Sequence, residues 1–243
     1  MFNNYTIQRN KPSFSAHIKM CSYSKIEKYL ESGIEVSGGY NAMYNIAEAS
    51  YGKKIGTRRI CDCNAVSIFG KNTVNNLVMH LCPDDESIFG NLAENLIALG
   101  EKFRNTVNLL KQEGIKPEGL IFGGNYRYPK SKELTVILKY FLEKVGINPT
   151  IFAGTEGSKN IFYQGNLNTW MTNIKNIEKN EKSHVMKAFD YIRVAPEDVV
   201  EFSDIKVKGT DESLKKGHIG FTIHDVLNKY VLDPETVLKQ VNF

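Results

Sequence analysis

One long amphipathic helix is the feature that most limits how this chain can fold. Seven apolar residues follow one another at intervals of three or four: Phe89, Leu92, Leu96, Leu99, Phe103, Val107 and Leu110. This spacing places them on one face of an α-helix. Gly114 stands just after the last of them, where a helix C-terminus favours glycine. We therefore predict a helix over 85–113 whose apolar face must be covered by a sheet or by other helices.

Short apolar runs on both sides of this helix predict β-strands. Two runs, 60–69 and 74–81, flank Gly70-Lys71-Asn72-Thr73, a sequence typical of a hairpin turn. Further strands are predicted at 119–122, 150–152 and 160–163, and further helices at 131–145, 222–230 and 234–241. This mixture indicates an α+β fold, with a mixed, mostly antiparallel sheet system flanked by helices.

The composition indicates a globular protein with a sizeable core. The 243 residues are 42% hydrophobic and 24% charged, and the net charge of +4 has no obvious cluster. These values argue against a disordered chain and against a nucleic-acid partner. No apolar run is long enough for membrane insertion, and the N-terminus has no apolar signal stretch. Four cysteines are too few for a disulfide scaffold, so we expect a reducing, cytoplasmic compartment.

The predicted hairpin brings thiols and an imidazole to one face. If the turn is centred on Gly70-Lys71-Asn72-Thr73, the numbers of cross-strand partners sum to 143. Cys63 then faces His80, and Cys61 faces Cys82. Directly opposite residues have Cβ atoms roughly 4.5–5.5 Å apart, which lets a thiol and an imidazole share a proton. The other face is the one predicted to be buried, and it carries Val66, Ile68, Leu77, Met79 and Leu81.

Three interpretations of this face remain open from the residues alone. Cys63 and His80 are typical of nucleophilic catalysis, in which histidine takes the thiol proton and returns it to the leaving group. Alternatively, the four side chains of Cys61, Cys63, His80 and Cys82 are plausible zinc ligands. The third interpretation is a set of small buried residues with a hydrogen-bonded histidine. Adjacent charge also matters, because Asp62 raises the pKa of a nearby thiol while Arg58 and Arg59 oppose that effect.

The segment 51–175 resembles the CheD-type chemoreceptor glutamine deamidases. Thr57, Cys63 and His80 have the spacing of that family's threonine, its nucleophilic cysteine six residues later, and its histidine seventeen residues after the cysteine. Pro83 follows the histidine closely, as in the family. Phe122-Gly123-Gly124 matches the family's Phe-Gly-Gly element after the long helix. The same catalytic arrangement occurs in toxins of the cytotoxic necrotizing factor type. The tetrapeptide Ile60-Cys61-Asp62-Cys63 differs from the Leu-Gly-Ser-Cys that is usual in the family.

This resemblance implies a β-sandwich flanked by helices and a protein-glutamine deamidase activity. Cys63 would be the nucleophile that forms a thioester, His80 the base and then the acid, and Thr57 the group that orients His80. No cofactor is implied, and the implied partner is a protein that presents a glutamine. The protein would act in the cytoplasm of its own cell, or as a toxin-like bacterial effector delivered into a host cell. The alternative is a zinc-binding or catalytically inactive protein-interaction module on the same scaffold.

The chain is predicted to have three parts. A catalytic core that resembles CheD covers 51–175, an N-terminal helical extension covers 1–50, and a mixed C-terminal appendage covers 176–243. The boundary of the appendage is predicted from the polar stretch 173–182, which is rich in lysine and asparagine. The two helices predicted in the appendage have a helix–turn–helix outline. However, acidic Asp233 and Glu235 open the second one, where contacts to DNA need basic groups.

Overall fold

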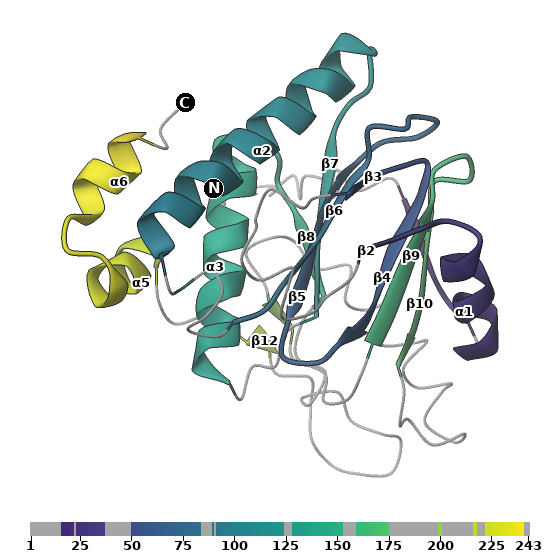
Figure 1. The fold of residues 1–243 in the computed structure, drawn as a ribbon, viewed down its shortest axis with the longest axis horizontal. Helices are drawn as coiled ribbons and strands as arrows, with labels where there is room; N and C mark the ends of the chain where they lie inside the picture. The colour runs from purple at the N-terminus through teal and green to yellow at the C-terminus, as the bar shows by residue number, and fades with distance from the viewer. Residues whose placement is uncertain are drawn as a thin grey trace, which may run out of the picture.

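Two five-stranded sheets face one another and are flanked by helices (Figure 1). The computed structural model describes residues 16–21, 23–36, 50–83, 89, 91–123, 128–152, 159–174, 199–200, 216–217 and 222–240. The first sheet has the order β1 (His17–Met20), β10 (Thr169–Ile174), β9 (Lys159–Gln164), β4 (Lys54–Ile60), β2 (Ile34–Val36). The second has the order β3 (Ser50–Tyr51), β6 (Leu77–Leu81), β5 (Asn64–Phe69), β7 (Glu118–Gly123), β8 (Thr150–Phe152).

The fold is α+β, with mixed and mostly antiparallel sheets, as predicted. Parallel pairing is limited to β1 with β10, β2 with β4, and β7 with β8, among the strands that the structure describes. A separate short ribbon is formed by β11 (Val199–Val200) and β12 (Lys216–Gly217). None of the described helices is both long and apolar enough to cross a membrane.

Helices cover the outer faces of both sheets (Figure 1). The second sheet is covered by α2 (Leu92–Gln112) and α3 (Pro129–Lys144), and the first by α1 (Tyr23–Glu31). Two C-terminal helices, α5 (Ile223–Tyr230) and α6 (Pro234–Gln240), pack on α3 and α2 respectively. The apolar stripe predicted for the long helix is buried in the core beside the second sheet, as expected. The helix begins at Leu92, however, so Phe89 joins this core from the turn before it and not from the predicted helix.

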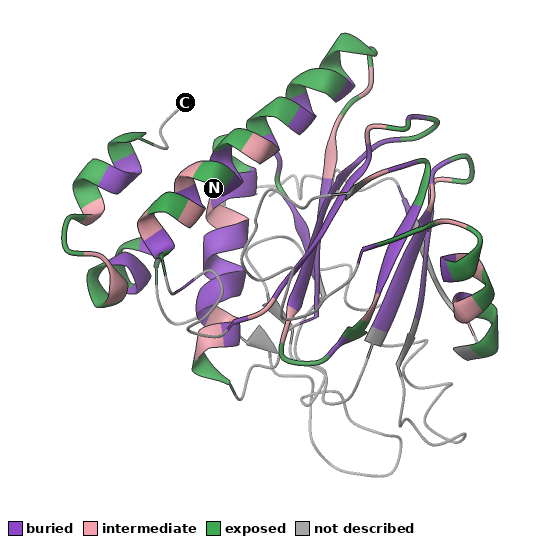
Figure 2. Cartoon of the chain, viewed as in Figure 1, coloured by how far each residue is buried: buried purple, intermediate pink, exposed green. Residues whose placement is uncertain are grey.

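Strands β5 and β6 are buried on both faces (Figure 2). The face predicted to be buried does lie in the large apolar cluster with α2 and α3. The opposite face is covered by the first sheet, where Phe69 packs on Tyr163 and Trp170 with ring centroids 5.0 and 5.3 Å apart. The hydroxyl of Tyr163 also donates a hydrogen bond to the Gly70 carbonyl at 3.1 Å, which ties the two sheets together.

The predicted hairpin differs from the observed one in two ways. The run 60–69 is not one strand, because the chain bends at 61–63 and passes from β4 in the first sheet to β5 in the second. The connection from β5 to β6 is also longer than a four-residue turn, since β6 begins only at Leu77. The Asn76 side chain closes this longer loop, because it accepts a hydrogen bond from Gly70 N–H and donates to the Thr73 carbonyl.

Strand β10 was not predicted, and it explains the position of Trp170. Trp170 lies in this strand and pairs with Tyr163 of β9, the strand predicted at 160–163. The predicted polar boundary 173–182 overlaps this strand at its last two residues. Residues 175–182 lie outside the described residues.

The flanking segments take part in the same architecture. The described part of 1–50 supplies α1 and the edge strands β1 and β2, which complete the first sheet. Residues 37–49 of the predicted N-terminal extension lie outside the described part of the chain. The two predicted C-terminal helices are observed and add Ile223, Val226 and Leu227 to the large core. The three-part division of the chain stays a prediction.

Substitution of Phe69 should test the packing between the sheets. Phe69 is fully buried, so Phe69→Ala leaves a cavity next to Trp170 and should lower the free energy of unfolding by about 3–5 kcal/mol. The matched control is Val74→Ala in the neighbouring loop, where the side chain is 62% exposed and the expected change is within about 0.5 kcal/mol. Urea unfolding followed by circular dichroism measures both values. Equal stabilities of the two variants would contradict the sandwich packing.

Candidate active site

The site lies where the chain passes from one sheet to the other. The register between β4 and β9 shifts after Thr57, and Arg59 adopts a left-handed φ of 60° at this bulge. The Asn160 side chain accepts a hydrogen bond from Arg59 N–H at 2.9 Å, which supports that backbone conformation. Bulges of this kind bend a strand and redirect the side chains that follow. The bend 61–63 comes directly after it, so the bulge aims Cys63 toward the second sheet.

Helix α3 holds the bend from outside. The Ser131 hydroxyl donates a hydrogen bond to the Asp62 carbonyl at 2.7 Å. Next along the chain, the buried Asn64 side chain donates to the Thr135 hydroxyl at 2.8 Å. Both contacts come from the first two turns of α3. The backbone on each side of Cys63 is therefore fixed by side-chain hydrogen bonds.

Gly123 makes room for the backbone of Cys63. It is the last residue of β7, pairs with Asn64, and has a φ of 100°. A Cβ atom added here would lie 2.8 Å from the Cys63 carbonyl oxygen and 2.3 Å from Cγ2 of Ile60. Only glycine tolerates both the conformation and the close approach. The glycine of the Phe-Gly-Gly element thus lies beside the predicted nucleophile, while Gly124 lies outside the described residues.

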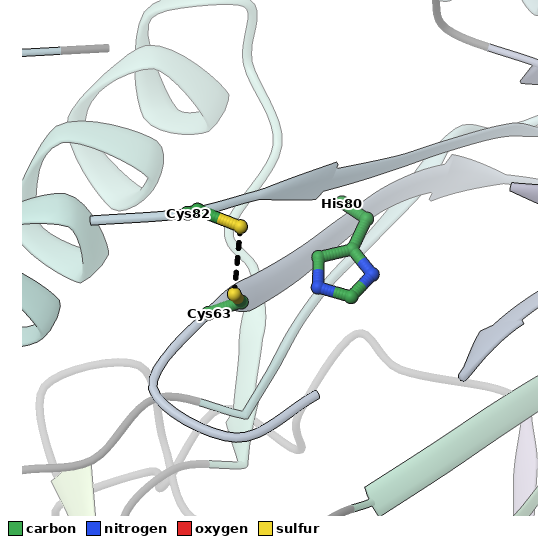
Figure 3. Close-up of side chains that lie close together, drawn as sticks. All are labelled: Cys63, His80 and Cys82. Atoms are coloured by element: carbon green, nitrogen blue, oxygen red, sulfur yellow. Dashed lines mark hydrogen bonds between the residues drawn. The ribbon is translucent and has the colours of Figure 1, made fainter. Parts of the chain in front are cut away.

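The observed register corrects the predicted pairing of the candidate residues. Asn64 pairs with Leu81 and Ala65 with His80, so partner numbers sum to 145 and not to 143. Cys63 therefore lies opposite Cys82, just beyond the last ladder pair, and His80 lies diagonally from Cys63 on the same face. The sulfur atoms of the two cysteines are 2.8 Å apart (Figure 3). The longer loop at 70–76 accounts for the shift of two residues.

Thr57 fixes the orientation and the tautomer of His80. Its hydroxyl donates to the Val36 carbonyl at 2.7 Å and also lies 2.8 Å from Nδ1 of His80. A hydroxyl has one proton to donate, and a carbonyl can only accept. The proton between Thr57 and His80 must therefore belong to Nδ1. This network assigns the lone pair of the neutral imidazole to Nε2.

The free nitrogen of His80 faces the two sulfurs. Figure 3 shows one ring nitrogen directed toward Cys63 and Cys82 and the other turned away. One ligand atom from each of these three residues lies within 4.8 Å of the others. Nε2 is buried and has no hydrogen-bond partner among the described residues. Since a buried polar atom without a partner costs free energy, the position is typical of a group kept for function.

Burial and the neighbouring thiol keep this site uncharged at rest. Burial lowers the pKa of His80 to about 4, so the imidazole is neutral at physiological pH. The Cys82 thiol, hydrogen-bonded to Cys63, raises the pKa of the Cys63 thiol, and burial raises it further. Asp62 also raises it, as expected. Arg58 does not offset this effect in the way we predicted, because its guanidinium pairs with Glu27 and Glu35.

The structure brings together the three residues predicted for catalysis, and it separates one predicted zinc ligand from the rest. Thr57, Cys63 and His80 form one connected group. Cys61 is exposed and is not part of the Cys63–His80–Cys82 cluster. Sequence reasoning missed the supporting roles of Ser131, Asn64, Thr135 and Val36. No short-range signal identifies these residues, since each acts through a contact with a distant part of the chain.

Comparisons with known proteins do not place the chain in a family. No family model matches it, and no curated protein matches its sequence.

The neutral state of His80 predicts how stability depends on pH. An ordinary histidine in the unfolded chain titrates near 6.5, whereas His80 in the folded protein titrates near 4. Between these values the unfolded state binds more protons, so stability is complete above pH 6.5 and is lost as pH falls through 4. The loss should approach ~3 kcal/mol. Urea unfolding at several pH values measures it, and His80→Gln should show a shallower slope. Identical slopes would contradict the buried neutral imidazole.

Proposed function

We propose that this protein is a cysteine-dependent deamidase that hydrolyses the side-chain amide of a glutamine in a target protein. The observation that carries the proposal is the hydrogen-bonded chain from the Val36 carbonyl through Thr57 to Nδ1 of His80. These hydrogen bonds leave the Nε2 lone pair near the Cys63 sulfur, with no hydrogen-bond partner among the described residues. The arrangement is that of a nucleophile, a base and an orienting third group.

In the first half of the reaction, the Cys63 sulfur attacks the carboxamide carbon while Nε2 of His80 takes the thiol proton. Because both groups are neutral at rest, proton transfer accompanies the attack and does not precede it. The imidazolium then gives its proton to the amide nitrogen. The carbon–nitrogen bond breaks, ammonia leaves, and the acyl group remains on Cys63 as a thioester. Throughout, the Nδ1–H of His80 stays bonded to Thr57.

In the second half, a water molecule attacks the thioester. Nε2 of His80 takes one proton from the water and returns it to the departing Cys63 sulfur. The products are a glutamate on the target protein and the original thiol. The net reaction consumes one water and releases one ammonia, and no metal or organic cofactor takes part.

The choice of glutamine rests on two arguments. The spacing of Thr57, Cys63 and His80, together with Phe122-Gly123-Gly124, resembles that of the CheD-type deamidases. In addition, His80 is only 5% exposed and Cys63 is half-buried. A carboxamide at the end of a flexible side chain can reach such a sulfur more readily than a main-chain peptide bond can. Both arguments favour side-chain hydrolysis over proteolysis.

Loss of the nucleophile should abolish deamidation. Cys63→Ala should remove ammonia release and all modified glutamines when the chain is incubated with candidate bacterial or host proteomes. Each modified glutamine is detected by mass spectrometry as a gain of about 1 Da. Cys61→Ala is the matched control, since its thiol is exposed and lies outside the cluster, and it should retain activity.

Thr57→Val adds a test of orientation, because it removes the acceptor for Nδ1–H and should reduce the rate by one to two orders of magnitude. Thr57→Ser should restore most of that rate. Full activity of Cys63→Ala would disprove the assignment of the nucleophile. Inactivity of every variant and of the unmodified chain would instead favour a non-catalytic interaction module.

A metal site is the second candidate function, and one observation favours it. Cys63, His80 and Cys82 each offer a ligand atom within 4.8 Å of the others. Two thiolates on a tetrahedral zinc ion lie about 3.8 Å apart, given zinc–sulfur bonds of roughly 2.3 Å. The sulfurs here are 2.8 Å apart, so the side chains would have to separate to admit the ion. The nucleophile–base arrangement needs no such movement.

Metal analysis of the purified chain distinguishes the two candidates. For the deamidase we expect no stoichiometric zinc after purification without chelators, as measured by elemental mass spectrometry. For the metal site, about one zinc per chain is required, with loss of the ion in Cys82→Ala and retention in Cys61→Ala.

A further inference from the structure

We propose that Cys63 and Cys82 form a reversible disulfide that switches the nucleophile off. The two residues lie directly opposite one another across β5 and β6, one position beyond the pair Asn64–Leu81. Their sulfur atoms are 2.8 Å apart. The existence of the disulfide is independent of the proposed deamidase activity, and only its effect on the reaction rests on that proposed function.

The geometry allows the bond to form with little rearrangement. A disulfide has a sulfur–sulfur length of about 2.05 Å, so the two sulfurs need to approach by less than ~1 Å. Cys63 belongs to the bend 61–63, and Cys82 follows the end of β6, so neither lies inside the ladder. Side-chain rotation at these two positions therefore does not break the pairing between β5 and β6.

Neither Cys61 nor Cys21 is placed as well as Cys82 to form a disulfide with Cys63. Cys61 is exposed and outside the cluster, although it is only two residues from Cys63. Cys21 packs beside Ile26 and Leu30, in the small core under α1 on the outer face of the first sheet. Cys82 is thus the thiol placed to act as a resolving cysteine for Cys63. Both members of the pair are half-buried, so a small oxidant can reach them.

The oxidant that we propose is a peroxide. The Cys63 thiolate attacks one peroxide oxygen, the oxygen–oxygen bond breaks, and a sulfenic acid forms with release of hydroxide or water. The Cys82 sulfur then attacks the sulfenic sulfur and expels water. In sum, two thiols and one hydrogen peroxide give one disulfide and two water molecules. Nε2 of His80 can accept the proton of Cys63 in the first step, as it does in the proposed hydrolysis. A dithiol reductant reverses the change by thiol–disulfide exchange.

Cys82, the proposed disulfide partner of Cys63, also slows the oxidation of Cys63 at neutral pH. The hydrogen bond between the two thiols and the burial of Cys63 both raise the pKa of Cys63, so its thiolate fraction is small. Oxidation should therefore speed up as pH rises. This pH dependence of the oxidation rate distinguishes the Cys63–Cys82 pair from an exposed thiol that is already highly reactive at neutral pH.

Peptide mapping of the full-length chain tests the disulfide without any measurement of activity. The reduced protein is treated with hydrogen peroxide, its remaining thiols are alkylated, and it is digested with a protease that cleaves before aspartate. Cleavage before Asp62 separates Cys61 from Cys63, so the linked residues can be identified. Cys63 and Cys82 fall in the same fragment, residues 62–83, and we expect this fragment to lose about 2 Da and to resist alkylation. Cys61→Ala should keep this link, and Cys82→Ala should lose it.

The activity of the same samples tests the switch. Oxidised wild-type protein should lose at least nine-tenths of its ammonia release and regain it with dithiothreitol. Cys82→Ala should be active when reduced but should lose activity irreversibly in peroxide, because Cys63 then proceeds to sulfinic acid. An intact disulfide in a chain that never releases ammonia would support the redox pair while refuting the deamidase.

Three results would overturn the proposal. One is a link between Cys61 and Cys63 in place of the predicted link. Another is over-oxidised Cys63 beside a free Cys82 thiol. The third is a bound metal ion that protects both cysteines from peroxide. Full deamidase activity in the chain with a mapped Cys63–Cys82 disulfide would overturn the switch itself.

Discussion

The hydrogen bond between Thr57 and His80 is the interaction on which the candidate site depends, because it joins one sheet to the other. The imidazole comes from β6 and the hydroxyl from β4. Neither sheet alone can therefore fix the tautomer of His80. The acceptor that holds Thr57 in turn is the carbonyl of Val36 on the edge strand β2. A strand from the N-terminal fifty residues therefore takes part in orienting His80.

Aromatic packing also joins the two sheets that supply Thr57 and His80. Phe69, Tyr163 and Trp170 fill the space between β5 and the pair β9–β10. A close-packed interior transmits strain and tolerates little sliding. Because the polar contact and the aromatic core share the same two sheets, a change of sheet spacing would disturb both together. The stability of the core and the geometry of His80 are thus physically coupled.

The sequence predicted the fold class and the grouping of Cys63 with His80, and the limits of that prediction have physical causes. The hairpin register was wrong by two residues, since the side chain of Asn76 closes a loop that looks like a shorter turn. Because side chains alternate across a strand, an error of two preserves the face, while an error of one would have reversed it. Cys63 and His80 were therefore placed on the correct face with the wrong partners.

Side-chain hydrogen bonds between distant parts of the chain could not be predicted from the sequence. Nothing near Thr57 indicates that its hydroxyl reaches Val36, and nothing near Asp62 indicates that Ser131 holds its carbonyl. Strand β10 was not predicted because its sequence runs into a polar stretch. Its alternation of inward and outward side chains is also short, with Trp170 facing inward and Met171 outward. The expectation that Thr57 lies with Cys63 and His80 came from a resemblance in spacing and not from periodicity.

The three chemistries considered for Cys63 compete for the same sulfur electrons, and they differ in what they do to His80. A metal ion would use the lone pair of Nε2 as well as both sulfurs. The disulfide would use the sulfurs alone and would leave Nε2 buried with no partner among the described residues, as it is in the reduced protein. Hydrolysis needs both the sulfur and Nε2 to be free. In the proposed oxidised state, His80 would therefore keep the free-energy cost of its burial. Reduction would return the Cys63 thiol to an imidazole that Thr57 already orients.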